Sequence, residues 1–297
     1  MLDQLASGEL FDRVRGLHWP ARRLQRGVHH GGHRSTRIGA SPEFMQYREY
    51  RPGDEAASID WKLYGRTERL AVRQTHDDSE LRTVILVDAS ASMAFPEPGH
   101  DKWRLAVALA CGLAAVVQND RDPVGLAVVG AAGAELLPPR ARLSTVANFV
   151  RVLNGIEPAG ATPLAPTLAA LRAHNRIAII SDFLGDAEAL REVAAELIAA
   201  GREVHVIHVV AREELEPREL GSLVVDPEAE ERVRRPLDEA GLAEYQRAFG
   251  EWREALAAEW RAAGAYYQLA LTDEPVDQLI RRIVTPAATA AETGTVS

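Results

Sequence analysis

The chain has 297 residues, of which 46% are hydrophobic and 26% charged, and its formal net charge is −9 at pH 7. This is ordinary composition for a globular protein, with room for one large domain and a smaller one. A single cysteine, Cys111, excludes an intrachain disulfide framework, and its apolar surroundings predict a small core residue. No apolar run reaches the roughly 20 residues of a membrane span, and no signal-length hydrophobic stretch begins the chain, so we expect a cytoplasmic protein.

Basic residues gather near the N-terminus. Residues 13–41 contain seven arginines, four histidines and no acid. The arginines are interleaved with glycine, histidine and leucine rather than with aromatic residues, and no nucleic-acid motif surrounds them. Two interpretations stay open: an arm that binds nucleic acid, or a basic arm that packs on the acidic body or contacts a partner.

Charges of both signs are mixed with apolar residues between Arg48 and Gln74. Pro52-Gly53 suits a type II turn, and the alternation from Asp60 to Leu63 predicts extended chain with Trp61 and Leu63 packed. Exposed charge pairs stabilise little, so the mixture indicates either a hairpin that braces a sheet or a surface that meets a partner. We expect residues 1–80 to form an N-terminal arm and a small β-containing segment.

From residue 81 to 285, β-rich runs alternate with helical patterns, which predicts an α/β domain with a mainly parallel sheet and helices on both faces. A short connection at 130–133 joins the second and third strands, which predicts a hairpin and one antiparallel edge. The expected strands are 83–87, 124–129, 134–137, 176–180, 203–210 and 265–271. The expected helices are 102–118, 144–153, 163–174 and 187–200.

The C-terminal part interrupts this alternation. Residues 222–237 predict an inserted hairpin or loop, and Asp238 can cap a helix whose apolar residues lie three and four apart as far as Trp260. A final short helix is expected after Pro275, and residues 286–297 have the composition of a disordered tail.

Carboxylates follow two of the predicted strands directly. Asp88 follows the strand 83–87, and Asp182 follows the strand 176–180. In an open α/β sheet, ligands collect beyond the carboxyl ends of the strands, where the strand order reverses. If these two strands are neighbours at that point, both carboxylates face one crevice.

Hydroxyl groups accompany the two carboxylates. Ser90 and Ser92 alternate with alanines after Asp88, and Thr162 precedes a helix that must run back toward the start of the strand 176–180. An all-oxygen cluster suits a hard cation, so we expect Mg²⁺, with Mn²⁺ or Ca²⁺ as alternatives. The absence of sulfur and imidazole argues against zinc. The other interpretation is that the two serines only cap the following turn.

These residues resemble the metal-ion-dependent adhesion site of the von Willebrand factor A domain, which has an Asp-x-Ser-x-Ser loop, a distant Thr and a distant Asp. The resemblance spans residues 81–271 and implies a Rossmann-like A-type fold. It also implies that an acidic side chain of a protein partner completes the metal shell. The implied metal ligands are Asp88, Ser90, Ser92, Thr162 and Asp182. An apolar rim around the contact is predicted from Met93, Phe95, Phe183 and Leu184, although each also suits packing at a strand end.

The block from Arg48 to Gln74 resembles the signature of the domain of unknown function 58 family, in which such a segment precedes an A-type domain. The resemblance implies a metal-dependent binding module or adaptor that works with an AAA ATPase of the MoxR group in chaperone-like maturation or assembly of other proteins. Basic residues that family members often carry before the Ile-Asp-Trp motif are replaced here by Ala57 and Ser58. The matching residues are Arg51, Gly53, Asp54, Asp60, Trp61 and Arg66.

An enzyme such as a magnesium-dependent phosphohydrolase is the alternative. It needs a nucleophile or a general base beside the metal, and hydroxyls and alanines surround Asp88 instead. His100, Glu97 and Asp101 in the next loop are the candidates for a base. We therefore expect a binding protein rather than an enzyme.

Overall fold

The computed structural model describes residues 8–22, 38–49, 61–67, 69, 71–76, 80–97, 99–142, 144–161, 163–185, 187–217, 223–224, 235–236 and 239–285. The chain divides into two compact units, one made of Met1–Trp19 with Arg82–Ser297 and the other of Pro20–Leu81. Within the described residues, no helix combines the length and the hydropathy that a membrane crossing requires.

In the smaller unit, β1 (Ile38–Glu49) pairs antiparallel with β2 (Ala71–His76). The expected extended chain at Trp61 is wrong, because Trp61 begins the helix α3 (Trp61–Thr67), in which the Thr67 hydroxyl donates to the Leu63 carbonyl at 2.9 Å. In this short run, the backbone hydrogen bonds of a helix stabilise the chain more than the apolar alternation would stabilise a strand. Of the signature residues, Arg66 is exposed on α3, and Arg51, Gly53, Asp54 and Asp60 lie outside the described residues.

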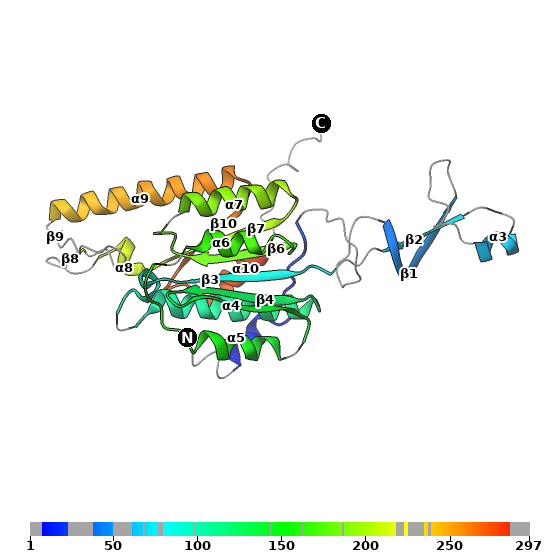
Figure 1. Cartoon of the computed structure of the whole chain (residues 1–297), viewed down its shortest axis with the longest axis horizontal. Helices are drawn as coiled ribbons and strands as arrows, with labels where there is room; N and C mark the ends of the chain where they lie inside the picture. The colour runs from blue at the N-terminus through cyan, green and yellow to red at the C-terminus, as the bar shows by residue number, and fades with distance from the viewer. Residues whose placement is uncertain are drawn as a thin grey trace, which may run out of the picture. The chain divides into compact units, whose positions relative to one another are not determined.

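The larger unit is built on a six-stranded sheet with the order β10-β7-β6-β3-β4-β5 (Figure 1). Numbered by their order along the chain and taken from β5 across to β10, these strands follow the doubly wound pattern 3-2-1-4-5-6. All neighbours are parallel except β4 and β5, so the predicted hairpin edge is confirmed. The strands are β3 (Thr83–Ala89), β4 (Val124–Gly130), β5 (Gly133–Arg140), β6 (Arg176–Ser181), β7 (Glu203–Val210) and β10 (Tyr266–Leu271).

Helices cover both faces of this sheet, which confirms the predicted α/β class (Figure 1). Alternate residues of β3 serve the two cores: Ile85 and Val87 face one, while Val84 and Leu86 face the other. One core includes α2 (Glu9–Val14), α4 (Asp101–Asn119), α5 (Thr145–Leu153) and α10 (Val276–Val284). The opposite core includes α6 (Leu164–Ala170), α7 (Ala187–Ala199) and α9 (Glu239–Ala262).

Three details differ from or refine the sequence-based expectations. The helix α6 ends at Ala170, four residues before the predicted end at 174. Residues 171–173 form a turn, after which the Asn175 side chain accepts the Arg82 backbone N–H at 3.2 Å. In the predicted insert, β8 (Leu223–Val224) pairs antiparallel with β9 (Arg235–Pro236). Cys111 is buried in the core, and burial raises the pKa of its thiol to about 12.

Part of the predicted N-terminal arm belongs to the larger unit. The helix α2 packs on α4 and α10, and Trp19 is fully buried. The guanidinium of Arg176 lies 4.4 Å from the centre of the Trp19 ring, and its Nη1 donates to the Trp19 carbonyl at 2.9 Å. The predicted boundary at residue 80 therefore leaves α2 and Trp19 out of the larger unit. Their sequence does not show which part of the chain they pack against, because the few apolar residues there lie next to a basic run.

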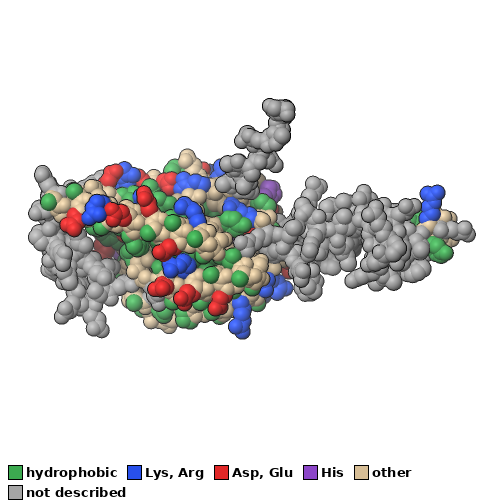
Figure 2. Space-filling view, turned by 90° about the horizontal axis from the view of Figure 1, so that it is seen from above, with side chains coloured by type: hydrophobic (Ala, Val, Ile, Leu, Met, Phe, Trp, Pro, Cys, Tyr) green, Lys and Arg blue, Asp and Glu red, His purple; other side chains and the backbone are tan. Residues whose placement is uncertain are grey.

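Two arginines at the start of the basic segment pair with acids of their own chain. Arg13 contacts Glu9 at 2.7 Å and Asp277 at 3.6 Å, and Arg15 contacts Asp12 at 2.8 Å. Acidic and basic side chains are also interspersed on the face seen in Figure 2, the side on which α7 and α9 lie. Among the described residues on that face, the charges do not form the one-sided basic surface that is typical of nucleic-acid binding.

We predict that Trp19→Ala lowers the free energy of unfolding of the larger unit by about 3–5 kcal/mol, because a fully buried indole and its contact with Arg176 are lost. Urea denaturation followed by circular dichroism measures the change. Leu136→Ala is the control, since Leu136 is 54% exposed on β5, and it should stay within about 0.5 kcal/mol of wild type. Equal stability of Trp19→Ala and wild type would show that the N-terminal segment is not part of this core.

Candidate functional site

The carboxyl edge of the sheet brings the predicted acids together. β3 and β6 are parallel neighbours whose last register pair is Val87 with Ile180. Asp88, the last residue but one of β3, therefore lies beside Ser181, and Asp182 follows Ser181 immediately. The predicted neighbouring of these two strands at the switch point is confirmed.

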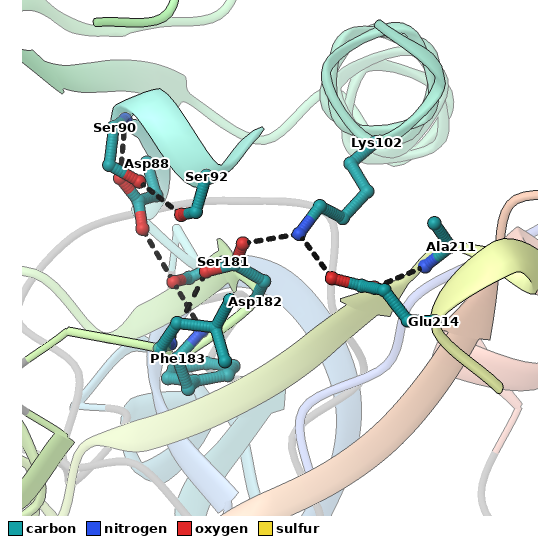
Figure 3. A network of polar contacts seen from close by, with 10 residues as sticks. Asp88, Ser90, Ser92, Lys102, Ser181, Asp182, Phe183, Ala211 and Glu214 are labelled. Atoms are coloured by element: carbon teal, nitrogen blue, oxygen red, sulfur yellow. Dashed lines mark hydrogen bonds and ion pairs between the residues drawn. The ribbon is translucent and has the colours of Figure 1, made fainter. Parts of the chain in front are cut away.

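Hydrogen bonds fix the orientation of the Asp88 carboxylate (Figure 3). Its Oδ1 accepts the backbone N–H of Ser90 at 2.9 Å, and its Oδ2 accepts the hydroxyl of Ser181 at 2.6 Å. The hydroxyl oxygens of Ser90 and Ser92 lie 3.0 Å apart. Asp88 is 5% exposed and the two serines less, so these oxygens are held in place beneath the surface.

The spacing of the serine hydroxyls allows a test of whether these residues suit a metal ion. Two adjacent ligands of an octahedral Mg²⁺, each at about 2.1 Å, are about 3.0 Å apart. The Ser90 and Ser92 hydroxyls are hydrogen-bonded at 3.0 Å, which is compatible with this separation, and the Asp88 carboxylate lies beside them. Among the described residues, no group of three or more His, Cys, Asp or Glu side chains could hold a metal. A cation here would therefore depend on hydroxyl groups and water, which fits Mg²⁺ and does not fit zinc.

Thr162 lies outside the described residues, but the loop just before it is tied to the Asp88 loop. The Ala91 backbone N–H donates to the Gly160 carbonyl at 2.8 Å, and the Ala159 N–H donates to the Ala89 carbonyl at 3.0 Å. This connection keeps the start of the segment that leads to α6 at the carboxyl edge.

A buried lysine joins Asp182 to a third carboxylate (Figure 3). The Nζ of Lys102, in the first turn of α4, lies 2.7 Å from Asp182 Oδ2 and 2.7 Å from Glu214 Oε1. Glu214 belongs to α8 (Arg212–Leu215), and its Oε2 accepts the Ala211 N–H at 2.7 Å. We call Asp88, Ser90, Ser92, Lys102, Ser181, Asp182 and Glu214 the carboxyl-edge cluster.

Charge pairing decides the protonation of Lys102. Burial lowers the pKa of its ammonium group, but Asp182 and Glu214 outweigh burial and hold the pKa above its ordinary value. Burial also raises the pKa of Glu214, and Lys102 offsets part of that rise. Lys102 is therefore a permanent positive charge in the cluster.

Beside Asp182, the backbone takes a strained conformation. Phe183 has a φ of 56°, which costs a non-glycine residue about 1–2 kcal/mol. Its N–H donates to the Ser181 hydroxyl at 2.9 Å, and its ring packs against His208 and Trp260 at centroid distances of 5.6 and 5.5 Å. The turn thus sends the phenyl ring into the core and leaves the Asp182 carboxylate facing Lys102.

The predicted apolar rim divides into exposed and buried residues. Phe95 is 40% exposed and Leu184 is 45% exposed, whereas Phe183 is 3% exposed and Met93 is fully buried. Met93 and Phe183 are therefore core residues and not part of a contact surface. Met93 lies in the 3₁₀ turn η2 (Ala91–Ala94), which directs it inward.

Sequence reasoning missed Lys102, Ser181 and Glu214. For Lys102 a signal was present, because Leu105, Ala106 and Leu109 follow it at spacings of three, four and seven and share the core face of α4. A charged residue on an apolar helix face needs a buried partner. Nothing comparable marks Glu214, whose role depends on the chain turning back after β7.

Comparison with protein families gives one match over most of the chain. The model of the family described as "Protein of unknown function DUF58" matches residues 46–255. An uncharacterized protein of Mycobacterium tuberculosis strain H37Rv is 33% identical over 248 residues, which cover 80% of this chain and 77% of the relative.

Solved structures resemble the chain more distantly. The conserved hypothetical protein BatB from Bacteroides thetaiotaomicron is 16% identical, with a TM-score of 0.43 over 69% of this chain and 97% of its own. The VWA domain of SpRpn10 is 13% identical, with a TM-score of 0.39 over 67% of this chain and 93% of its own. What the carboxyl-edge cluster does has to follow from its own residues.

We predict that His208 makes the folded chain sensitive to acid. Burial lowers the pKa of His208 on β7 to about 4, below the 6.5 of an unfolded histidine. Between these values the unfolded chain binds more protons, so stability falls as the pH drops from 6.5 to 4, by about 3 kcal/mol from this residue. Urea denaturation of wild type and His208→Asn at pH 7 and pH 4.5 should show a smaller loss in the variant. Equal losses would mean that His208 is not held neutral in the folded state.

Proposed function

The chain belongs to the family described as protein of unknown function DUF58, and we propose that it is a protein-binding module that recognises an acidic side chain at the carboxyl-edge cluster with the help of a divalent cation. The observation behind this proposal is the convergence of the Asp88 carboxylate with the two serine hydroxyls, whose 3.0 Å hydrogen bond is compatible with two adjacent ligands of an octahedral cation. Asp88, Ser90 and Ser92 would hold the cation, with Asp182 and, by resemblance, Thr162 as further ligands. When bound, Mg²⁺ would offer a carboxylate from outside an open coordination position.

Exposed apolar side chains support a protein rather than a small-molecule partner. Phe95 and Leu184 follow the metal loop and Asp182 within three residues, and both are exposed. The oxygens of the cluster itself are nearly covered. Phe95 and Leu184 are thus the groups that an approaching surface meets first, and apolar contacts of this kind provide much of the affinity of protein interfaces.

The resemblance of the block from Arg48 to Gln74 implies a partner among the MoxR-type AAA ATPases or their client proteins. In this proposal the chain acts as an adaptor in maturation or assembly of other proteins, and it is not an enzyme. The groups that donate to the Asp88 and Asp182 carboxylates are hydroxyl, amide and ammonium groups, and the proposal assigns no general base to the cluster. A screen with p-nitrophenyl phosphate and Mg²⁺ or Mn²⁺ should therefore detect no turnover above buffer.

We predict that Asp88→Asn weakens Mn²⁺ binding at least about tenfold while the fold is kept. The amide can still accept the Ser90 N–H and still contact the Ser181 hydroxyl, whereas alanine would leave both donors without their acceptor. Removing one of the acids also relieves repulsion in the metal-free state, so stability in chelator should not fall. Isothermal titration calorimetry measures the affinity, and urea denaturation measures the stability.

The matched control is Asp101→Asn, which makes the same charge change at the exposed start of α4. It should bind Mn²⁺ like wild type. If Asp88→Asn and wild type bind Mn²⁺ equally, the cation does not use this cluster and the proposed mechanism is wrong.

We predict that Leu184→Ala weakens the complex with a MoxR-type ATPase from the same source roughly tenfold and leaves Mn²⁺ affinity unchanged, because it removes an exposed contact and no ligand. Chelator should weaken the same complex. Surface plasmon resonance with the full chain measures both effects, and Leu136→Ala serves as the exposed leucine control. Binding that is indifferent to chelator and to Leu184→Ala would place the partner elsewhere on the chain.

A further inference from the structure

The ammonium of Lys102 contacts Asp182, one of the proposed ligands of the cation. It lies 2.7 Å from Asp182 Oδ2, and Lys102 is fully buried. We propose that Lys102 is a tethered cation that competes with a divalent cation for Asp182, and that Glu214 determines how strongly it competes. This inference rests on the proposed cation site.

Both oxygens of Asp182 already have donors. Oδ2 receives Lys102, and Oδ1 receives the Leu184 N–H at 3.3 Å. The Lys102 contact is short and charge-assisted, so it is the stronger of the two. Asp182 can serve a divalent cation fully only when the ammonium leaves Oδ2, because two cations beside one carboxylate repel each other.

Glu214 gives the ammonium a second acceptor at the same distance. Lys102 Nζ is 2.7 Å from Glu214 Oε1, and the Ala211 N–H holds the other oxygen of Glu214 in place. The flexible lysine stem lets Nζ move toward Glu214 without losing its last partner. Leaving Asp182 therefore does not strand a buried, unpaired charge, which would be prohibitive.

The charge of Lys102 also bears on this exchange. With its ammonium beside Asp182, an approaching divalent cation meets a positive charge at one of its proposed ligands. Without Lys102, Asp182 and Glu214 would keep their negative charges and attract the cation more strongly.

Two substitutions with opposite expected effects test the proposal. Lys102→Met removes the competitor and should tighten Mn²⁺ binding on the order of tenfold, and Glu214→Gln leaves the ammonium to Asp182 alone and should weaken it by a similar factor. Electron paramagnetic resonance titration of the full chain with Mn²⁺ measures both affinities.

Matched controls make the same charge changes outside the cluster. Arg104→Met removes an exposed positive charge from α4, two residues from Lys102, and Glu216→Gln removes an exposed negative charge just after α8. Both should bind Mn²⁺ within about twofold of wild type, because exposed charges are screened by solvent.

If the Lys102→Met variant folds poorly in chelator, thermal unfolding still tests the proposal. Its melting temperature should fall in chelator and rise with Mn²⁺ by more than that of wild type, by mass action. A larger rise of the melting temperature in the variant than in wild type supports the proposal, and an equal or smaller rise contradicts it.

The outcomes separate this inference from the proposed function. If Asp88→Asn loses Mn²⁺ but Lys102→Met binds no more tightly than wild type, or Glu214→Gln no more weakly, the cation site stands and the competition is wrong. If wild type binds no Mn²⁺ but Lys102→Met does, the tethered cation is supported and the native chain's use of metal is wrong. Tight Mn²⁺ binding by the double variant Lys102→Met/Asp88→Asn would overturn both.

Discussion

One buried ammonium group fixes the arrangement of the carboxyl edge. Lys102 connects the first turn of α4 with Asp182 after β6 and with Glu214 on α8. An ammonium can be buried only where carboxylates compensate it, and removal of one partner leaves an uncompensated charge that destabilises the fold strongly. The positions of α4, the end of β6 and α8 therefore depend on one another through this group.

Strand pairing provides the other half of the site. The parallel register of β3 and β6 sets Ser181 beside Asp88, where its hydroxyl donates to the carboxylate. The left-handed backbone at Phe183 then separates two neighbouring side chains. Its ring enters the core toward Trp260, while Asp182 turns to Lys102. Strain at one residue thus keeps a carboxylate at the edge that packing alone would not orient.

Much of this architecture follows from short-range patterns in the sequence. Apolar runs of β-formers, helical spacing and the short connection at 130–133 predict the strands, most helices and the antiparallel edge. The convergence of Asp88 and Asp182 can be predicted from their positions at the ends of two strands. The contact of Lys102 with Glu214 cannot, because it depends on the direction of a side chain on α4 and on the path of the chain after β7. Met93 and Phe183 were predicted as rim residues because sequence distance from a ligand does not show which way a turn directs a side chain.

Buried charges are paired differently at the two ends of the sheet. At the amino edge, Arg176 pairs with Glu203 at 3.1 Å, both side chains are at most 1% exposed, and the Trp19 carbonyl takes a further donor of the guanidinium. One positive and one negative charge balance there, so the edge suits a permanent anchor. At the carboxyl edge, Asp182 and Glu214 share the ammonium of Lys102, which lies 2.7 Å from each of them. Removing that ammonium would leave two buried carboxylates without their shared counter-charge. The amino edge thus holds the chain together through one closed pair, whereas the carboxyl edge has one cation between two carboxylates, the arrangement on which the proposed competition with a divalent cation rests.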